Sequence, residues 1–350
     1  MARPLPIRPF SDTAFPNAAF HVNTASVGIP PLAAVAALHR YADNMTRGVC
    51  DTATYAVHVE RCRAAFGSLV GVRSRDVAIA GTVSHVVGMA AASLPAGSRV
   101  LCVEDDFTSV TGPFLSDPRL RVTLVPFEAL LESIRPGIDL VAVSAVRSND
   151  GRVLDLSALA AASQAVGALT VVDATHGTGW LTIDAKPFDI VVSAGYKWLL
   201  TPRGISFAAI NPSATWLRPI YANWSGTDDP WNSLYGPSLR LSADARRFDS
   251  SPPWPLLEAA AISLETVASA QGLGEWSVGL ANAFRAELGL AASNSPIISL
   301  PGDPAPLADA GVAVAARAGR VRLSFYGYND EVAVERAARA VRESSMALAS

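Results

Sequence analysis

Residues 191–204 read VVSAGYKWLLTPRG, and this stretch indicates a buried strand with a chemical group at its end. The apolar run is typical of a strand, and a small-residue turn ends it. Lys197 follows directly, and an arginine and a glycine stand on the Pro-containing loop after it. Most lysines are solvated at the protein surface, so a lysine at the mouth of a buried strand needs an explanation from the rest of the chain.

Similar apolar runs recur up to residue 210, and helical patterns separate several of them. The runs are continuous rather than alternating, which is typical of strands buried on both faces of a parallel sheet. They cover residues 77–81, 99–104, 121–127, 139–146, 169–174, 189–195 and 205–210. Helices are expected at 84–94 and 155–168, the second with Asp155 as its N-cap. This pattern predicts an α/β fold with a doubly wound, mostly parallel sheet of seven strands.

The character of the sequence changes after residue 211. Residues 212–255 are rich in Pro, Trp, Gly and Asp, as in a functional loop region or a linker. Helices are expected at 255–271 and from Glu275 into the 280s, followed by the runs VAVAAR and RVRLSFYGY and a helix over 329–345. This order predicts a smaller α+β C-terminal domain. We therefore expect an N-terminal arm, a large domain and a small domain with an interface segment, at residues 1–20, 21–225 and 226–350.

The composition limits the classes of function. Of the 350 residues, 50% are hydrophobic and 17% are charged, and the net charge is −3 with a pI near 6.0. This balance predicts a large core and no electrostatic footprint for nucleic acid. No apolar run is long enough to span a membrane, and residues 1–20 lack the apolar core of a signal peptide. The five histidines and the three cysteines (Cys50, Cys62 and Cys102) have no metal-ligand spacing, so we expect no metal and a cytoplasmic location.

Two strand ends present opposite charges to one crevice. Asp173 ends the strand in ALTVVDATHGTGW (168–180), and Lys197 follows the end of the next strand, 24 residues later. Ligands of open α/β sheets bind beyond such ends. A buried carboxylate needs a positive partner, so the two residues could simply form an ion pair. The segment AIAGTVSHVVG (78–88) adds the start of a helix, whose free N–H groups suit a phosphate. A lysine for a Schiff base, a carboxylate for a pyridine nitrogen and a phosphate-binding helix start together predict a pyridoxal phosphate site.

The chain resembles a known family, the class V aminotransferases. VVDATH, SAGYKWLLTPRG and RVRLSFYGYN carry the resemblance, which covers about residues 20–345. The family includes cysteine desulfurases, kynureninases and isopenicillin N epimerase-like proteins. The resemblance implies a fold type I enzyme that binds pyridoxal 5′-phosphate, acts on a small-molecule amino acid through a lysine Schiff base and forms a homodimer with shared active sites.

The resemblance also assigns residues, one position at a time. Lys197 is similar to the Schiff-base lysine, Asp173 to the partner of the pyridine nitrogen, and His176 to the side chain near the ring oxygen, although a buried structural histidine is the alternative. The expected phosphate-binding residues are Thr82, Val83, Ser84, Ser193 and Tyr196.

Further residues are assigned around the expected ring and substrate. Phe107 falls where relatives stack an aromatic ring on the cofactor, but it could be plain core. Arg147 and Ser148 fall where relatives contact cofactor or substrate, with a surface arginine as the alternative. Arg322 is similar to the arginine that holds the substrate α-carboxylate. Asn329, just after it, is expected to cap the last helix.

Two segments resemble those that reach the neighbouring subunit. Trp224 in YANWSG and Ser251 in RRFDSSPPW are expected to contact the partner's cofactor phosphate. A purely structural interface would explain the same Trp-rich composition.

The sequence favours some reactions of the family over others, but it does not select a single one. An aminotransferase-type reaction is the first expectation and a β-eliminating C–S lyase the alternative, with an epimerase or a catalytically silent protein of this fold less favoured. A desulfurase is disfavoured because no cysteine stands in the segment before Arg322. A true kynureninase is disfavoured because little beyond Tyr196 and His176 matches.

Overall fold

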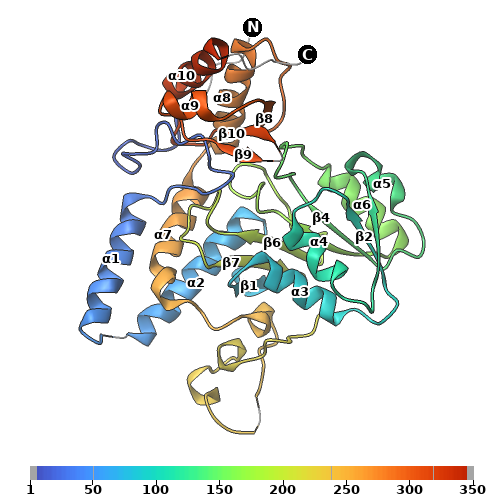
Figure 1. The fold of residues 1–350 in the computed structure, drawn as a ribbon. Helices are drawn as coiled ribbons and strands as arrows, with labels where there is room; N and C mark the ends of the chain where they lie inside the picture. The colour runs from blue at the N-terminus through green and yellow to red at the C-terminus, as the bar shows by residue number, and fades with distance from the viewer. Residues whose placement is uncertain (1–5, 50, 238, 318, 345–350) are drawn as a thin grey trace.

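The computed structural model describes residues 6–49, 51–237, 239–317 and 319–344, and its centre is one seven-stranded sheet (Figure 1). The strand order is β1-β7-β6-β5-β4-β2-β3, and β7 runs antiparallel to both of its neighbours while the other pairs are parallel. The strands are β1 (Val77–Ala80), β2 (Arg99–Val103), β3 (Arg121–Val125), β4 (Leu140–Ser144), β5 (Leu169–Asp173), β6 (Ile190–Ala194) and β7 (Ser206–Ile210). The predicted α/β architecture is confirmed.

Side chains of this sheet alternate between two apolar layers. On β6, Val191 packs in one layer, whereas Ile190 and Val192 pack in the other. One layer contains the helices α3 (Val83–Ser93) and α4 (Thr108–Leu115). The opposite layer contains α2 (Thr52–Leu69), α5 (Leu130–Ser133), α6 (Leu156–Val166) and α7 (Trp254–Ser269). Burial on both faces is why the sequence of these strands is apolar without alternation.

Strand β3 departs from that expectation. Residues 121, 123 and 124 are exposed, because β3 is the edge strand of the sheet. The predicted helix cap at Asp155 is confirmed, since its side chain accepts a hydrogen bond from the backbone N–H of Ala158 at 2.9 Å.

A second, antiparallel sheet lies above the large one in Figure 1. Its order is β8-β10-β9, and it packs with α8, α9 and α10 around a third apolar cluster. These elements are β8 (Ile297–Pro301), β9 (Ala315–Arg317), β10 (Arg320–Ser324), α8 (Leu273–Glu287), α9 (Ala305–Asp309) and α10 (Glu331–Glu343). This smaller body agrees with the α+β character expected of the C-terminal region.

The domain boundaries remain a prediction, but two segments bear on them. Helix α7 follows the expected boundary at residue 225, yet it packs against α1 (Leu32–Thr46) and α2 beside the large sheet. Near the N-terminus, His21 and Asn23 form β-bridges to Ala313 and Ser324 of the small body. Helix α7 therefore packs with the large body, whereas the N-terminal segment joins the two bodies.

Asn329 is not the cap of the last helix, so that expectation was wrong. Asp330 caps α10 by accepting a hydrogen bond from the N–H of Ala333 at 3.0 Å. The Asn329 side chain is fully buried, where its amide donates to the carbonyl oxygen of Ala19 and its oxygen accepts from the N–H of Tyr326. Its polar atoms thus join the N-terminal segment to the small body.

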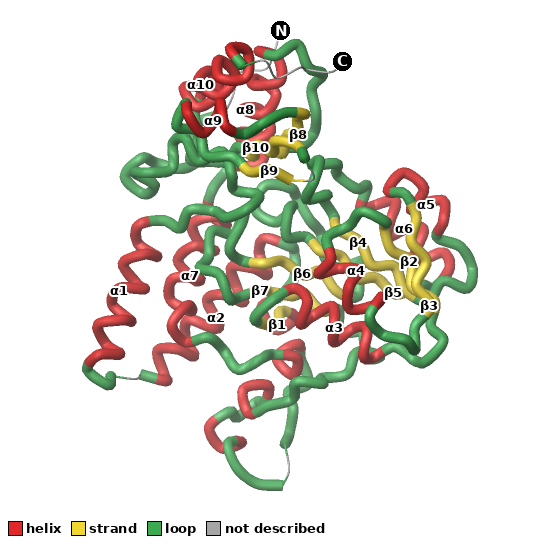
Figure 2. The backbone as a smooth tube through the Cα atoms, viewed as in Figure 1, coloured by secondary structure: helices red, strands yellow, loops and turns green. Residues whose placement is uncertain are grey.

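Between β7 and α7, the described residues form short 3₁₀ turns and one isolated β-bridge between Thr227 and Leu241, and Figure 2 shows this segment as mostly loop. No helix among the described ranges is both long and apolar enough to cross a membrane.

Candidate active site

The ends of β5 and β6 and the start of α3 enclose a cavity of about 240 Å³. Asp173 is the last residue of β5, and Lys197 stands three residues beyond the end of the neighbouring parallel strand β6. Eight of the expected cofactor-binding residues line this cavity, namely Thr82, Val83, Ser84, Phe107, Asp173, His176, Tyr196 and Lys197. The chain order of strands and turns brings them together from four separate stretches of sequence.

Lys197 holds its amine in a nearly closed environment. The residue is 7% exposed, its Nζ lies 2.9 Å from His176 Nε2, and it lies 5.3 Å from the centre of the Phe107 ring. Burial lowers the pKa of Lys197 to about 8; nearby arginines, including Arg322, lower it as well, whereas Asp173 raises it. An appreciable fraction of the amine is therefore neutral near pH 8.

The backbone around this lysine is closely packed. Leu200 is fully buried and has a φ of 57°. Residues other than glycine seldom adopt this left-handed backbone conformation. Gly28 donates its N–H to the carbonyl oxygen of Tyr196 at 2.9 Å, and a Cβ at Gly28 would lie 2.0 Å from the carbonyl oxygen of Lys197. The N-terminal segment thus holds the lysine loop from one side.

Asp173 is buried without a cation. One of its oxygens accepts a hydrogen bond from the Thr175 N–H at 2.8 Å, and burial raises the pKa of Asp173 to about 6. In the part of the chain that the structure describes, no cation forms an ion pair with it, so the simple Asp173–Lys197 pair is not formed. A buried carboxylate that faces a cavity fits the protonated ring nitrogen of pyridoxal phosphate.

His176 connects the lysine to the core. The indole Nε1 of Trp198 lies 3.3 Å from His176 Nδ1, and an indole N–H can only donate. Burial lowers the pKa of His176 well below its usual range, so the ring is neutral. With Nδ1 as an acceptor, the ring proton lies on Nε2 and donates to Lys197 Nζ whenever that amine is neutral. This pattern agrees with the lowered pKa of Lys197.

The start of α3 supplies donors on the opposite side of the cavity. Thr82 is its N-cap, and the Thr82 Oγ1 accepts from the N–H of His85 at 3.3 Å and lies 3.2 Å from Ser84 Oγ. The N–H groups of Val83 and Ser84 belong to the first turn, which lacks partners within the helix. Donors of this kind suit an anion such as a phosphate.

Phe107 is not core, so the alternative considered for it was wrong. It is 46% exposed, and it precedes α4 with its ring beside Lys197 Nζ. Arg147 is not a surface residue either, because it is 4% exposed and its guanidinium lies 3.2 Å from the Asp150 carboxylate. Such close acidic neighbours already occupy part of its hydrogen-bonding capacity.

Three of the expected cofactor-binding residues lie apart from the cavity, and the expected substrate-binding residues Arg147, Ser148 and Arg322 do not line it either. Ser193 is fully buried and its Oγ lies 2.7 Å from Thr178 Oγ1, because alternate residues of β6 face opposite sides of the sheet and it is Ala194 that lines the cavity. Ser193 is therefore not placed to bind a phosphate there. Trp224 lines a different pocket, and Ser251 is an exposed residue of the same loop region.

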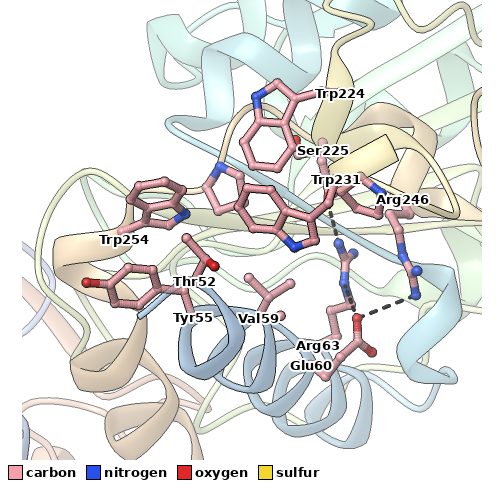
Figure 3. Close-up of a pocket in the computed structure, with 14 residues that line it drawn as sticks. Thr52, Tyr55, Val59, Glu60, Arg63, Trp224, Ser225, Trp231, Arg246 and Trp254 are labelled. Carbon is pink, nitrogen blue, oxygen red and sulfur yellow. Dashed lines mark hydrogen bonds and ion pairs between the residues drawn. The ribbon is translucent and has the colours of Figure 1, made fainter. Parts of the chain in front are cut away.

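That second pocket is aromatic (Figure 3). The rings of Trp224 and Trp231 lie 5.3 Å apart, and those of Tyr55 and Trp254 stack at 5.1 Å. The roles expected of Trp224 and Ser251 concern a neighbouring subunit and remain predictions.

Arg322 extends from β10 and is 2% exposed. Its Nη1 donates to the carbonyl oxygen of Ser148 at 2.5 Å, and its Nη2 donates to Ser26 Oγ at 2.8 Å. Sequence reasoning did not identify Ser26, nor Arg203 and Thr175, which line the cavity. Ser26 lies 296 residues from Arg322, and no local pattern in the sequence indicates that contact.

Comparisons with known proteins agree with this geometry. The family model described as aminotransferase class-V matches residues 31–220. An uncharacterised aminotransferase, YcbU, from Bacillus subtilis is 29% identical over 206 residues, covering 55% of this chain and 54% of its own. The isopenicillin N epimerase of Streptomyces clavuligerus is 27% identical over 184 residues, covering 47% and 46%. A kynureninase of Deinococcus radiodurans is 25% identical over 209 residues, covering 55% and 50%. The chain spans about half the length of these curated relatives.

Solved structures share the whole fold. A cysteine desulfurase from Thermococcus onnurineus NA1 superposes with a TM-score of 0.82 at 17% identity, covering 98% of both chains. A cystine C–S lyase superposes with a TM-score of 0.84 at 16% identity, covering 94% of this chain and 99% of its own. At these identities the likeness concerns the fold alone.

Proposed function

Because this chain belongs to the class-V aminotransferase family, it is a pyridoxal-phosphate-dependent enzyme, and we propose that it transforms an α-amino acid by an aminotransferase-type reaction. The main support for this proposal is that one cavity holds three groups that the cofactor needs. Lys197 supplies a buried amine with a lowered pKa, and Asp173 supplies a buried carboxylate that has no ion-pair partner. Both line the same cavity as the start of α3.

The residues fit three parts of the cofactor. Thr82, Val83 and Ser84 would hold the phosphate with first-turn N–H groups and hydroxyls. Asp173 would hold the pyridine nitrogen in its protonated form, since its pKa of about 6 leaves the carboxylate ionised at neutral pH. Phe107 offers an aromatic face beside Lys197 against which a flat ring can lie.

When bound, pyridoxal phosphate supplies an aldehyde and a ring that withdraws electrons from the substrate carbon next to nitrogen. Lys197 would supply the nucleophilic nitrogen to which the cofactor attaches. Its free Nζ would take the proton from the substrate Cα and, in an aminotransferase-type reaction, deliver it to a carbon other than Cα. His176 orients Nζ through the 2.9 Å contact. Arg322 binds the substrate carboxylate with its planar guanidinium.

A β-eliminating C–S lyase is the second candidate. The described cysteines, Cys62 and Cys102, are buried, and burial raises the pKa of each thiol to about 12, so neither is a good nucleophile. Cys50 lies outside the described residues. A reaction that needs an enzyme thiol is therefore disfavoured, whereas elimination from a sulfur-containing amino acid needs none.

An amino-acid panel separates the candidates. An aminotransferase should convert an amino acid only when an α-keto acid acceptor is added. A lyase should release pyruvate and ammonia without an acceptor, and an epimerase should change only the configuration at Cα. Lys197→Ala serves as the inactive control. Absence of turnover and of any spectral change with every amino acid would contradict the proposal.

The active sites are proposed to be shared within a homodimer. The rings of Trp224, Trp231, Trp254 and Tyr55 line an open pocket, and Trp231 is 45% exposed, which favours a surface that another chain covers. If Trp224 serves the neighbouring site, mixing inactive Lys197→Ala and Trp224→Ala proteins should restore activity, since hybrid dimers then contain one intact site. Light scattering that shows an active monomer would contradict this arrangement.

A further inference from the structure

Two arginines of the small sheet share one hydroxyl. Arg322 Nη2 lies 2.8 Å from Ser26 Oγ, and Arg317 Nη2 lies 3.2 Å from the same oxygen. Ser26 is held in place by the N-terminal segment, where its own N–H donates to the carbonyl oxygen of Asn23 and the N–H of Ala25 donates to Ser324 Oγ. The two guanidinium groups are therefore close neighbours across a fixed side chain.

The strand register explains how they meet. Arg322 of β10 is paired directly with Ala315 of β9, and Arg317 lies two residues further along β9, so both arginine side chains leave the same face of the sheet. Arg320 faces Arg317 in the register, but its guanidinium turns to Ser299 on the other neighbouring strand. In Figure 1, β9 is the strand of the small sheet nearer to the large sheet.

No acid balances this pair among the residues described. Neither Arg317 nor Arg322 forms an ion pair, and the buried Nε of Arg322 has no hydrogen-bond partner. The shared Ser26 is two residues before Gly28, whose N–H donates to the carbonyl oxygen of Tyr196 next to Lys197, so the arginine pair is joined to the lysine loop through the N-terminal segment. In keeping with this placement, both charges lower the pKa of Lys197 and of His176. Adjacent like charges are unfavourable unless an anion lies between or beside them.

We propose that Arg317 binds a second acidic group of the substrate, so that the enzyme acts on an α-amino acid with an acidic side chain. Arg322 takes the α-carboxylate at the buried end, and Arg317, which is exposed at the end of β9, takes the distal carboxylate. Ser26 positions the two guanidinium groups. This inference rests on the proposed function, because it assigns the α-carboxylate to Arg322.

The test measures binding without turnover. Isothermal titration of the holoenzyme with unreactive acids compares three diacids, succinate, glutarate and adipate, with the monoacids of equal length, butyrate, valerate and hexanoate. The best diacid should bind about tenfold more tightly than its monoacid, as expected for one additional charge-assisted contact. Arg317→Gln should remove this preference and leave the monoacid affinity unchanged. Arg317→Lys, which retains the charge, should retain part of it.

Arg320→Gln is the matched control, because it removes a neighbouring arginine of the same sheet that is paired with Ser299. It should change neither affinity. Equal binding of diacids and monoacids by the wild-type enzyme would overturn the proposal. So would an equal loss of both affinities in Arg317→Gln, which would place both arginines on one carboxylate. If the enzyme preferred diacids but converted no amino acid, the proposed function would be contradicted, whereas the binding of two acidic groups by Arg317 and Arg322 would be supported.

Discussion

Replacing Lys197 with methionine should stabilise the cofactor-free protein at neutral pH. The substitution keeps an unbranched side chain of similar length but removes an amine that is buried in the fold. Burial lowers the pKa of Lys197 from 10.5 to about 8, a value that already includes the attraction of Asp173. One pKa unit corresponds to about 1.4 kcal/mol, so the charged amine costs the folded state about 3 kcal/mol at pH 7.

The lowered pKa of Lys197 also fixes how the free energy of unfolding changes with pH. Between pH 8 and 10.5 the folded protein binds fewer protons at Lys197 than the unfolded chain, so the free energy of unfolding of the wild type rises with pH in that window. Below pH 8 the cost is fully present. The Lys197→Met protein lacks this rise, and the two stability curves should converge near pH 10.5.

Urea unfolding of the cofactor-free proteins at several pH values from 7 to 10.5 measures the difference. The chain has one other lysine, Lys186, which is exposed, so Lys186→Met is the matched control and should follow the wild-type curve. A Lys197→Met protein that is less stable than the wild type at pH 7, or a stability difference that does not shrink as pH rises, would contradict the unfavourable burial of a charged amine at Lys197.

Three further substitutions test other parts of the account. Asp173→Asn should lower kcat by roughly 100-fold or more while the fold remains intact by circular dichroism, because the ring nitrogen loses its charged partner. Gly28→Ala should shift the lysine loop, since its Cβ would lie 2.0 Å from the carbonyl oxygen of Lys197, and should weaken cofactor binding measured by absorbance titration. Arg63→Met should cost about 3–5 kcal/mol in denaturant unfolding, because it leaves the buried carboxylate of Asp249 without its ion-pair partner, and adding Asp249→Leu should recover part of that loss.

The sheet and the centre of the site were predictable because their signals are local. Each buried strand is a continuous apolar run, and the strand ends place Asp173 and Lys197 at one edge. Parallel neighbours with short connections bring such ends together in any doubly wound sheet. The start of α3 is likewise visible as a small-residue turn before an apolar helix.

The contacts made over long separations in sequence were not predictable in this way. Asn329 and Asp330 are both good caps by residue type, and only the buried contact with Ala19 decides between them. The hydrogen bond from Arg322 to Ser26 depends on how the N-terminal segment crosses the small body. Ser193 is a different case, because strand alternation already places it opposite Ala194, and a resemblance in sequence position outweighed that physical signal.

Reduction with borohydride shows directly whether the cofactor attaches to Lys197. The chain contains only Lys186 and Lys197, so peptide mass spectrometry of the reduced, yellow holoenzyme has two lysines to distinguish. We expect the pyridoxyl adduct on the peptide that contains Lys197 and no adduct in the Lys197→Ala protein. An adduct on Lys186, or a protein that takes up no pyridoxal phosphate, would contradict attachment at Lys197.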